Sequence, residues 1–462
     1  MQFEKKQPLR RTFAVALAAS AMISSMTART AFAGVPAYDH IVIVVEENKS
    51  GAPIYSDPTM NYFNNTLASG GVKFTNSYAT STPYNVIANG YTDPTPSRPS
   101  QPHYLYLFSG ANQGILPNWY QDPTSPYTGT AINDKNGNAL GTATAGANVG
   151  IGNSYIPLTK RPFTTPNLGA ALMKNVNNLP TGKTYASFSE SLPDPTFDGM
   201  SSSTTTDIYQ RKHNPTVNWI NYPGNSIAAD KQRFLLPVNS NLAFDPTTDA
   251  ASNKYDGFNK DKNGNARDYS TLPNVSIVVP NDQNNAHSNT NAASDLWLQT
   301  NIDSYAQCAK THNSLLIVTY DEDGSTNTTQ NTLANGRPGV FSRNYQFGRD
   351  PIATVFYGAN IAGGTVNNEP IDHLNVLATA LDSNGALGQF KSDFASAFPN
   401  LNDGTTGSAQ NAAELANLRP IVDVFGAGAA LSAPSVISVP EPTILGLIGL
   451  ATAGLLARRR RA

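Results

Sequence analysis

Cysteine is almost absent from this chain, because Cys308 is the single thiol among 462 residues. One thiol excludes intramolecular disulfides, so the fold has to be held together by its apolar core, with or without a bound metal ion. An isolated cysteine is more often a buried packing residue than a nucleophile. We therefore interpret Cys308 as structural.

Charge is sparse as well, since 14% of the residues are charged and the formal net charge is −2. This small value hides an uneven distribution, because five basic residues lie in segment 1–33 and four in segment 443–462. The remaining body has 22 Lys and Arg residues against 32 Asp and Glu residues. An acidic body argues against nucleic acid and anionic lipid surfaces as partners.

Hydrophobic runs long enough to span a membrane, about 20 residues, are also missing. The two runs nearest to that length lie at the chain ends. Near the N-terminus, basic residues, the apolar run 13–23 and a small-residue cleavage site at 31–33 form the pattern of a signal peptide over residues 1–33. The apolar run 443–456 would rise only about 21 Å as a helix, short of a hydrocarbon core of about 30 Å. We expect an exported protein whose mature chain begins near Gly34.

The C-terminal segment has three parts in a fixed order: Val-Pro-Glu-Pro at 439–442, the apolar run 443–456 and four arginines at 458–461. This arrangement resembles the PEP-CTERM sorting signal of Gram-negative bacteria that make extracellular polymer. The resemblance implies an exosortase-type sorting protease and extracellular polymer as partners. It also implies transient membrane anchoring, with the periplasm, outer surface or extracellular matrix as destination. A plain C-terminal membrane anchor is the alternative.

Glycine and proline are plentiful, with 35 and 32 residues, which indicates long ordered loops. Between the loops, short β-rich runs alternate with helical patterns. The expected buried strands are 40–45, 184–188, 275–279, 315–320 and 352–357, and the expected helices are 168–173, 292–309 and 372–381. This alternation predicts one α/β domain over 34–430, with a mixed, mostly parallel sheet covered by helices on both faces. Residues 431–462 are expected to form a linker and the sorting segment.

Carboxylates directly follow two of the expected strands, as Glu-Glu-Asn at 46–48 and Asp-Glu-Asp at 321–323. Ligands of open α/β sheets bind at the carboxyl ends of strands, and clustered carboxylates there repel each other unless a cation lies between them. Oxygen donors suit Ca²⁺, Mg²⁺ or Mn²⁺, and Zn²⁺ remains open. Either cluster alone fits solvated turn residues equally well, but together they favour a divalent metal site.

Ser100 lies just ahead of the apolar run 104–108, where a helix is expected to begin. Free backbone amides at a helix N-terminus stabilise an anionic substrate, so Ser100 is a candidate nucleophile. The competing interpretation is a helix N-cap, a role that serine often has. The local residues alone leave both open.

Four sequence blocks occur in an order that resembles a known family. They are His-Ile-Val-Ile-Val-Val-Glu-Glu-Asn at 40–48, Pro-Ser-Gln-Pro-His-Tyr at 99–104, Arg-Lys-His-Asn-Pro at 211–215 and Thr-Tyr-Asp-Glu-Asp at 319–323. With them, residues 39–382 resemble the phosphoesterase family of bacterial and fungal acid phosphatases and phospholipases C. That family is similar to the alkaline phosphatase superfamily. The resemblance implies an alkaline-phosphatase-like three-layer sandwich with long loops over the site.

The resemblance also implies roles for individual residues. Glu47, Asn48, Asp321 and Glu322 are implied as ligands of a divalent metal ion. Ser100 is implied as the nucleophile, and it would also face the metal.

Two histidines, His213 and His287, are implied to surround the phosphate. Two positions differ from the family pattern, because segment 285–288 reads Asn-Ala-His-Ser where Asp-x-His-Asp is usual, and His103 stands where asparagine is usual. Asp282 is a candidate to replace one of the lost carboxylates.

These features predict an exported, metal-dependent phosphoesterase, of the acid-phosphatase type that cleaves phosphomonoesters through a phosphoserine intermediate. The first alternative is a phospholipase C or another phosphodiesterase. The second is a non-catalytic surface protein that binds matrix or glycan, which the abundance of Asn, Gly, Ser and Thr would suit.

Overall fold

The computed structural model covers the central part of the chain with several gaps. It describes residues 34–80, 100–111, 131–133, 139–142, 163–197, 201–202, 209–221, 227–246, 255–324, 350–397 and 418–426. Both end segments, 1–33 and 431–462, lie outside the described residues, so the expected signal peptide and sorting segment are not described by the structure.

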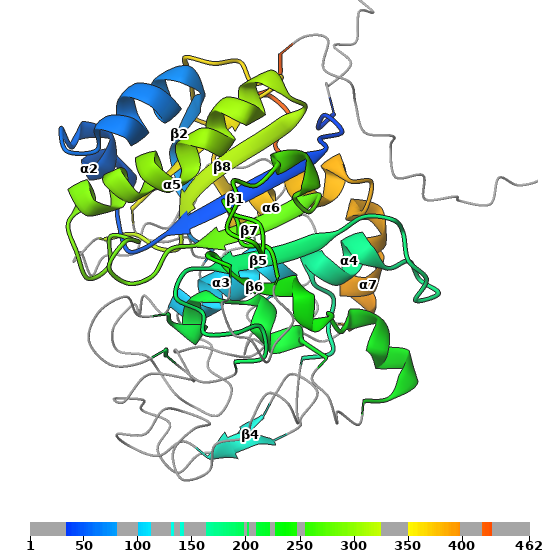
Figure 1. The fold of residues 1–462 in the computed structure, drawn as a ribbon. Coiled ribbons are helices and arrows are strands. Elements are labelled where there is room, and N and C mark those ends of the chain that lie inside the picture. The colour runs from blue at the N-terminus through cyan, green and yellow to red at the C-terminus, as the bar shows by residue number, and fades with distance from the viewer. Residues whose placement is uncertain are drawn as a thin grey trace, which may run out of the picture.

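A nine-stranded sheet forms the centre of the described part (Figure 1). Its strands are β1 (His40–Glu46), β2 (Val72–Tyr78), β5 (Tyr185–Ser189), β6 (Asn241–Ala243), β7 (Val275–Val279), β8 (Ser314–Tyr320), β9 (Ile352–Gly358), β10 (Thr365–Asn367) and β11 (Ile371–Asp372). The order is β10-β2-β9-β8-β1-β7-β5-β6, with β11 beside β2. Only β9 runs antiparallel to its neighbours β2 and β8. A separate hairpin pairs β3 (Ala131–Asn133) with β4 (Ala139–Thr142).

The prediction of a mixed, mostly parallel sheet is confirmed. Each of the five expected strands is present, and β1, β7 and β8 are buried along nearly their whole length, as their apolar runs of β-branched residues require. The sequence did not reveal β2, in which Lys73 and Asn76 are half-buried and Thr75 is exposed among buried neighbours.

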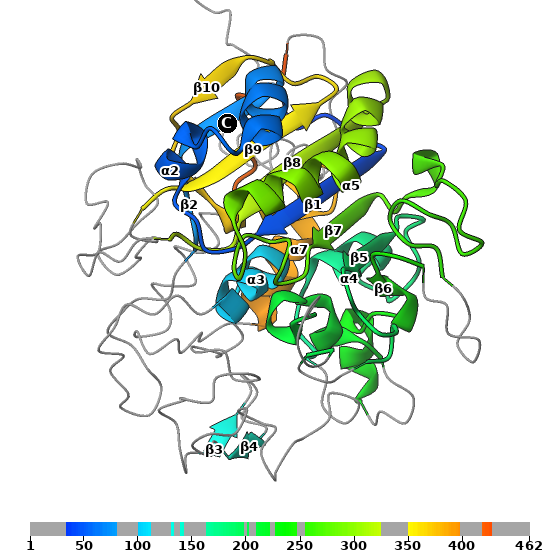
Figure 2. The same cartoon turned by 60° about the vertical axis from the view of Figure 1, so that its left-hand side comes forward.

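Helices cover both faces of the sheet and give three layers (Figure 2). One layer contains α3 (Ser100–Ser109), α4 (Leu168–Met173), α6 (His373–Ser383) and α7 (Leu387–Ala397). The other contains α2 (Gly51–Ser56), the π-helical turn η1 (Phe63–Ala68) and α5 (Asn291–Thr311). Short 3₁₀ turns lie at η3 (Arg211–His213), η4 (Thr216–Trp219), η5 (Ala229–Phe234), η6 (Val238–Ser240) and η7 (Tyr269–Thr271).

Strand β1 shows how the sequence builds the two cores. Ile41, Ile43 and Val45 pack into the core on the α3 and α6 face. The alternate residues Val42 and Val44 pack into the core on the α5 face. Successive side chains of a strand point to opposite faces, so a run of apolar residues fills both cores at once.

The pairing of β1 with β8 fixes where their polar ends meet. The two strands are parallel, and Glu46 lies opposite Tyr320. The backbone amide of Asp321 donates to the carbonyl of Glu46 at 2.8 Å. Glu47 and Asp321 therefore leave the sheet at the same edge, which is where ligands bind in open α/β sheets.

No helix among the described residues is long and apolar enough to cross a membrane.

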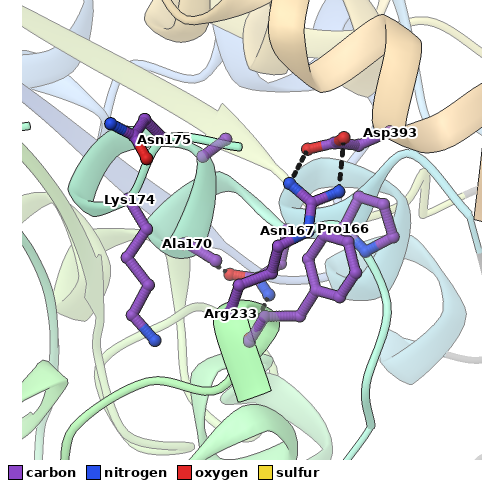
Figure 3. A pocket seen from close by; sticks show the side chains of 9 residues that line it. Pro166, Asn167, Ala170, Lys174, Asn175, Arg233 and Asp393 are labelled. Carbon is purple, nitrogen blue, oxygen red and sulfur yellow. Dashed lines mark hydrogen bonds and ion pairs between the residues drawn. The ribbon is translucent and has the colours of Figure 1, made fainter. Parts of the chain in front are cut away.

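A pocket with about 230 Å³ of empty space, part of it open to solvent, lies between α4, η5 and α7 (Figure 3). Arg233 reaches across it to Asp393, with Nη1 2.9 Å from Oδ2 and Nη2 2.5 Å from Oδ1. Gln389 donates to the same carboxylate at 2.8 Å, and the Arg233 guanidinium lies 4.3 Å from the ring centroid of Phe234. None of the predicted site residues lines this pocket. The bidentate pair instead ties η5 to α7.

We expect Asp393→Asn to lower the free energy of unfolding by about 2 kcal/mol, because it leaves a largely buried guanidinium without its charged partner. The matched control is Asp230→Asn. Its carboxylate, 73% exposed, lies 3.8 Å from Lys231, and the loss of such a surface pair should change stability by less than about 0.5 kcal/mol. Urea unfolding of both variants checks the difference. Equal stabilities would show that the Arg233 pair contributes nothing.

Candidate active site

Glu47 lies at the centre of a buried polar cluster at the carboxyl edge of the sheet. Its side chain is fully buried, and its carboxylate contacts two hydroxyls and an imidazole. Ser100 Oγ donates to Oε2 at 3.3 Å, and the Tyr104 hydroxyl donates to Oε1 at 3.1 Å. His213 Nε2 lies 2.9 Å from Oε1. The predicted residues Glu47, Ser100 and His213 are thus neighbours, although 53 to 166 positions separate Glu47 from them in sequence.

Helix α3 presents several of these groups from one face. It begins at Ser100, and all its residues are buried. Residues three and four positions apart lie on the same face of a helix, so Ser100, His103 and Tyr104 point toward the same region. The helix N-terminus therefore brings a hydroxyl, an imidazole and a phenol to the carboxylates.

A second group of side chains could hold a metal ion. His103, Asp321 and Glu322 are all buried, and one potential ligand atom from each lies within 4.8 Å of the others. The His103 Nδ1 to Glu322 Oε2 distance is 3.2 Å. Asp321 and Glu322 were predicted as ligands, whereas His103 was noted only as a departure from the family pattern.

Asn48 lies directly beside this group. Its backbone adopts a left-handed conformation with φ of 53°, which asparagine tolerates better than most residues. Its amide donates to Asp321 Oδ1 at 3.0 Å. Asn48 Oδ1 and Asp321 Oδ2 are buried, and neither accepts a hydrogen bond from the residues that the structure describes. Two such oxygens beside a carboxylate and an imidazole fit a divalent cation.

The pKa shifts in the cluster also favour a bound divalent cation. Burial raises the pKa of Asp321 well above its usual range, and the charge of Glu47 raises it further. Burial likewise raises the pKa of Glu47. For His103, burial and then the neighbouring His373 lower the pKa to about 3, which leaves a neutral ring nitrogen as a ligand. A cation would relieve the repulsion between the two carboxylates.

The two histidines predicted to surround the phosphate differ in position. His213 is buried, and that burial lowers its pKa well below the usual range, with a further lowering from Lys212. Its Nδ1 lies 3.6 Å from Asp282 Oδ1. His287 is exposed, and its ring centroid lies 6.5 Å from that of His213. His287 is therefore at the margin of the cluster.

His373, the first residue of α6, also lies near the cluster, since its ring centroid is 6.1 Å from that of His103. Its Nδ1 accepts a hydrogen bond from the Thr80 amide at 3.4 Å, and its Nε2 donates to the Tyr320 carbonyl at 3.0 Å. Both ring nitrogens thus bind backbone. The cap itself is Asp372, whose side chain accepts from Leu374 and Asn375.

Sequence reasoning missed two residues of the cluster, His103 and Tyr104. Their spacing in the sequence could have identified them. They stand three and four positions after Ser100 at the start of an expected helix, which places them on the same helix face as Ser100. No comparable spacing connects Asp282 with His213, and only the folded chain brings them together.

Solved structures of known proteins resemble this chain only distantly. A protein of the alkaline phosphatase superfamily from Vibrio parahaemolyticus is 12% identical, with a TM-score of 0.35, over 75% of this chain and 68% of that one. A sulfatase from Pseudoalteromonas sp. is 11% identical, with a TM-score of 0.34, over 92% of this chain and 78% of that one.

Sequence comparisons are more informative. The PEP-CTERM protein-sorting motif matches residues 438–461, which supports the interpretation of the C-terminal segment. A phosphatidylinositol-3-phosphatase from Mycobacterium tuberculosis is 30% identical over 349 residues, which cover 76% of this chain and 78% of the relative. The sequence model of the Phosphoesterase family matches residues 38–383, the segment that contains the whole cluster. The chain belongs to the Phosphoesterase family and is a hydrolase of phosphoric esters.

Proposed function

We propose that the protein is an exported, metal-dependent phosphomonoesterase of the acid-phosphatase type that forms a phosphoserine intermediate on Ser100. The observation that carries the proposal is the position of Ser100 at the N-terminus of the ten-residue helix α3. There its Oγ lies 3.3 Å from Glu47 Oε2, next to the buried cluster of His103, Asp321 and Glu322. A hydroxyl, carboxylates and helix amides around one point suit phosphoryl transfer to serine.

The ligands of the divalent ion would be His103, Asp321 and Glu322, together with Glu47 and the side-chain oxygen of Asn48. When bound, the ion neutralises phosphate oxygens and favours the ionised form of the serine hydroxyl. Carboxylate and amide oxygens suit Mg²⁺, Ca²⁺ or Mn²⁺, whereas the imidazole makes Zn²⁺ a further choice.

Ser100 Oγ gives its proton to the Glu47 carboxylate, to which it donates at 3.3 Å, and attacks phosphorus. A bond forms there while the bond from phosphorus to the ester oxygen breaks. The amides and the dipole at the N-terminus of α3 would stabilise the negative charge of the phosphate. The departing alkoxide takes a proton from a protonated histidine, for which His213 and His287 are the two candidates. His213 lies within the cluster, where burial lowers its pKa, and His287 is exposed at the margin. Water then attacks the phosphoserine, which releases inorganic phosphate and restores the serine.

The natural substrate has two candidate classes. The mycobacterial relative is named a phosphatidylinositol-3-phosphatase, and a phosphatase removes phosphate from a monoester. This favours a monoester over the diester that a phospholipase C would cleave. A phosphodiesterase remains the second candidate. Family membership sets aside the non-catalytic matrix or glycan-binding protein.

The proposal that the protein is exported is based on the segments at the two ends of the chain. The N-terminal segment has the pattern of a signal peptide, and the C-terminal segment matches a sorting motif. We propose that a sorting protease removes that motif from a transiently anchored precursor. The catalytic domain would then act in the periplasm, on the outer surface or in the extracellular matrix of a Gram-negative bacterium.

Ser100→Ala tests the function directly. We expect kcat for p-nitrophenyl phosphate to fall about a thousandfold or more, because the nucleophile is lost, while urea unfolding changes little. The wild-type protein should cleave the monoester in preference to bis(p-nitrophenyl) phosphate. Acid quenching of the wild-type reaction should trap phosphate on Ser100, as mass spectrometry would show.

The matched control is Ser109→Ala at the other end of α3, where Oγ donates to the carbonyls of Leu105 and Ala111. This variant should lose stability and keep kcat. If Ser100→Ala instead loses about 1 kcal/mol of stability and keeps its activity, Ser100 is a helix cap. Preference for the diester would favour the phosphodiesterase.

Removal of the metal should affect both activity and stability. We expect exhaustive chelation to abolish turnover and to lower Tm, because a bound cation stabilises the native state and offsets the clustered carboxylates. Glu322→Gln should weaken metal binding in elemental analysis and lower the rate together. Restoration by one added metal would identify the ion, whereas unchanged activity and Tm in metal-free protein would refute metal dependence.

Processing can be measured by intact-mass analysis of protein from the native host. We expect the mature chain to begin near Gly34 and to lack the arginines at 458–461. A mature chain that retains these arginines would support a plain membrane anchor instead.

A further inference from the structure

The described domain begins at the edge of the sheet where the parallel strands start, which we call the amino edge. Residues 34–38 lead directly into β1, and Val35 and Tyr38 are buried. The Tyr38 hydroxyl donates at 2.6 Å to the carbonyl of Ala359, just after the antiparallel strand β9 ends. The Tyr38 amide donates at 3.0 Å to Oγ of Ser383, the last residue of α6. These contacts fix the start of the domain at the amino edge.

The last described segment, 418–426, runs along α6 from the carboxyl edge toward the amino edge. Helix α6 begins at the carboxyl edge, directly after β11. In its first turn, Asn375 Nδ2 donates to the carbonyl of Arg419 at 3.0 Å. One turn later, Thr379 Oγ1 accepts from the amide of Ile421 at 2.9 Å. The segment therefore follows the helix away from the catalytic cluster.

The end of this segment is held at the amino edge. Residues 360–362 follow β9, and their backbone bonds to that of residues 424–426 at 2.7 and 3.0 Å. The ring of Phe425 lies 6.1 Å from that of Tyr38, measured between centroids. The chain thus leaves the domain beside the point where it enters.

The candidate active site lies at the opposite edge, because Glu47 and Asp321 directly follow the last residues of β1 and β8. The seven residues of β1 span about 23 Å, and the 21 residues of α5 cover about 31 Å from edge to edge. Residues 427–438, which lead to the sorting motif, reach about 40 Å at full extension. They would need nearly that extension to turn the carboxyl edge toward a surface at their far end, which costs conformational entropy.

We infer that the C-terminal segment attaches the protein through the amino edge, so that the active site faces away from the surface that holds it. Its substrates are then phosphate esters dissolved in the aqueous phase and not lipids of the bilayer that holds the precursor. The inference rests on the proposed function for the attachment and for the ester chemistry. Segment 418–426 creates this arrangement, because a chain that left the domain at Leu418 would leave near the carboxyl edge.

Energy transfer to a membrane dye measures the orientation without turnover. A chain of residues 34–438 contains every contact described here, and a phospholipid can be ligated enzymatically to its C-terminus. Ala292→Cys and Thr311→Cys, each combined with Cys308→Ser, place one donor dye at either end of α5, at exposed positions about 28 Å apart. On phosphatidylcholine vesicles with an acceptor lipid, we expect more efficient transfer from position 311 than from position 292. Equal or reversed efficiencies would overturn the inference.

Turnover provides a second test, with phosphatidate in the vesicles as a lipid phosphomonoester. Attachment to one surface accelerates a reaction there only where the geometry lets the two partners meet. We expect the protein anchored at 438 to cleave phosphatidate of its own vesicle no faster than phosphatidate of separate vesicles. It should keep the kcat of the free protein for p-nitrophenyl phosphate.

The matched control is the Ala292→Cys, Cys308→Ser protein, coupled through its new thiol to a maleimide lipid and therefore held near the carboxyl edge. It should cleave phosphatidate of its own vesicle about 100-fold faster than that of separate vesicles. The same gain in the protein anchored at 438 would contradict the inference.

Two further outcomes separate the inference from the proposed function. Cleavage of p-nitrophenyl phosphate without any cleavage of phosphatidate supports dissolved substrates, and energy transfer then decides the orientation. If the free protein cleaves neither ester, the proposed function fails, whereas the energy-transfer result still supports or overturns attachment through the amino edge.

Discussion

The burial of two interacting carboxylates, Glu47 and Asp321, at one edge of the sheet is the constraint on which the rest of this site depends. Burial alone raises the pKa of each group, and the charge of Glu47 raises the pKa of Asp321 further. Two such groups in a protein interior need a compensating cation or a full set of donors. The hydroxyls of Ser100 and Tyr104, the imidazole of His213 and the amide of Asn48 supply part of that compensation.

The scaffold explains how the carboxylates can be held so close together. Parallel pairing of β1 and β8 aligns Glu46 with Tyr320, so the residues that follow have to emerge together. Helix α3 then closes the cluster from the other side, because its first turn directs Ser100 and His103 toward the strand ends. The proposed nucleophile and the proposed metal ligands therefore depend on one strand register and one helix start.

Much of this arrangement could be predicted from the sequence. The features that could not be predicted depend on half-buried strands and on contacts that form only in the folded chain. Apolar runs of β-branched residues identify strands such as β1 and β8, and the polar residues after them identify the site edge. Strand β2 was missed because its half-buried positions do not form such a run. The contact of Asp282 with His213 depends on the path of the loops that carry the two residues, which no periodicity in the sequence records.

The order of strands in the sheet also has a consequence for how the chain folds. β1 lies between β7 and β8, so Ile41 finds its partners Val275 and Leu315 more than 230 positions later in the chain. Pairings of such high sequence separation form slowly, because a long loop has to close before any of them is stabilised. The cluster of Glu47 and Asp321 at the sheet edge requires both ends of this pairing, so partly synthesised chains lack it. Activity should consequently appear only late in folding, after most of the domain has assembled.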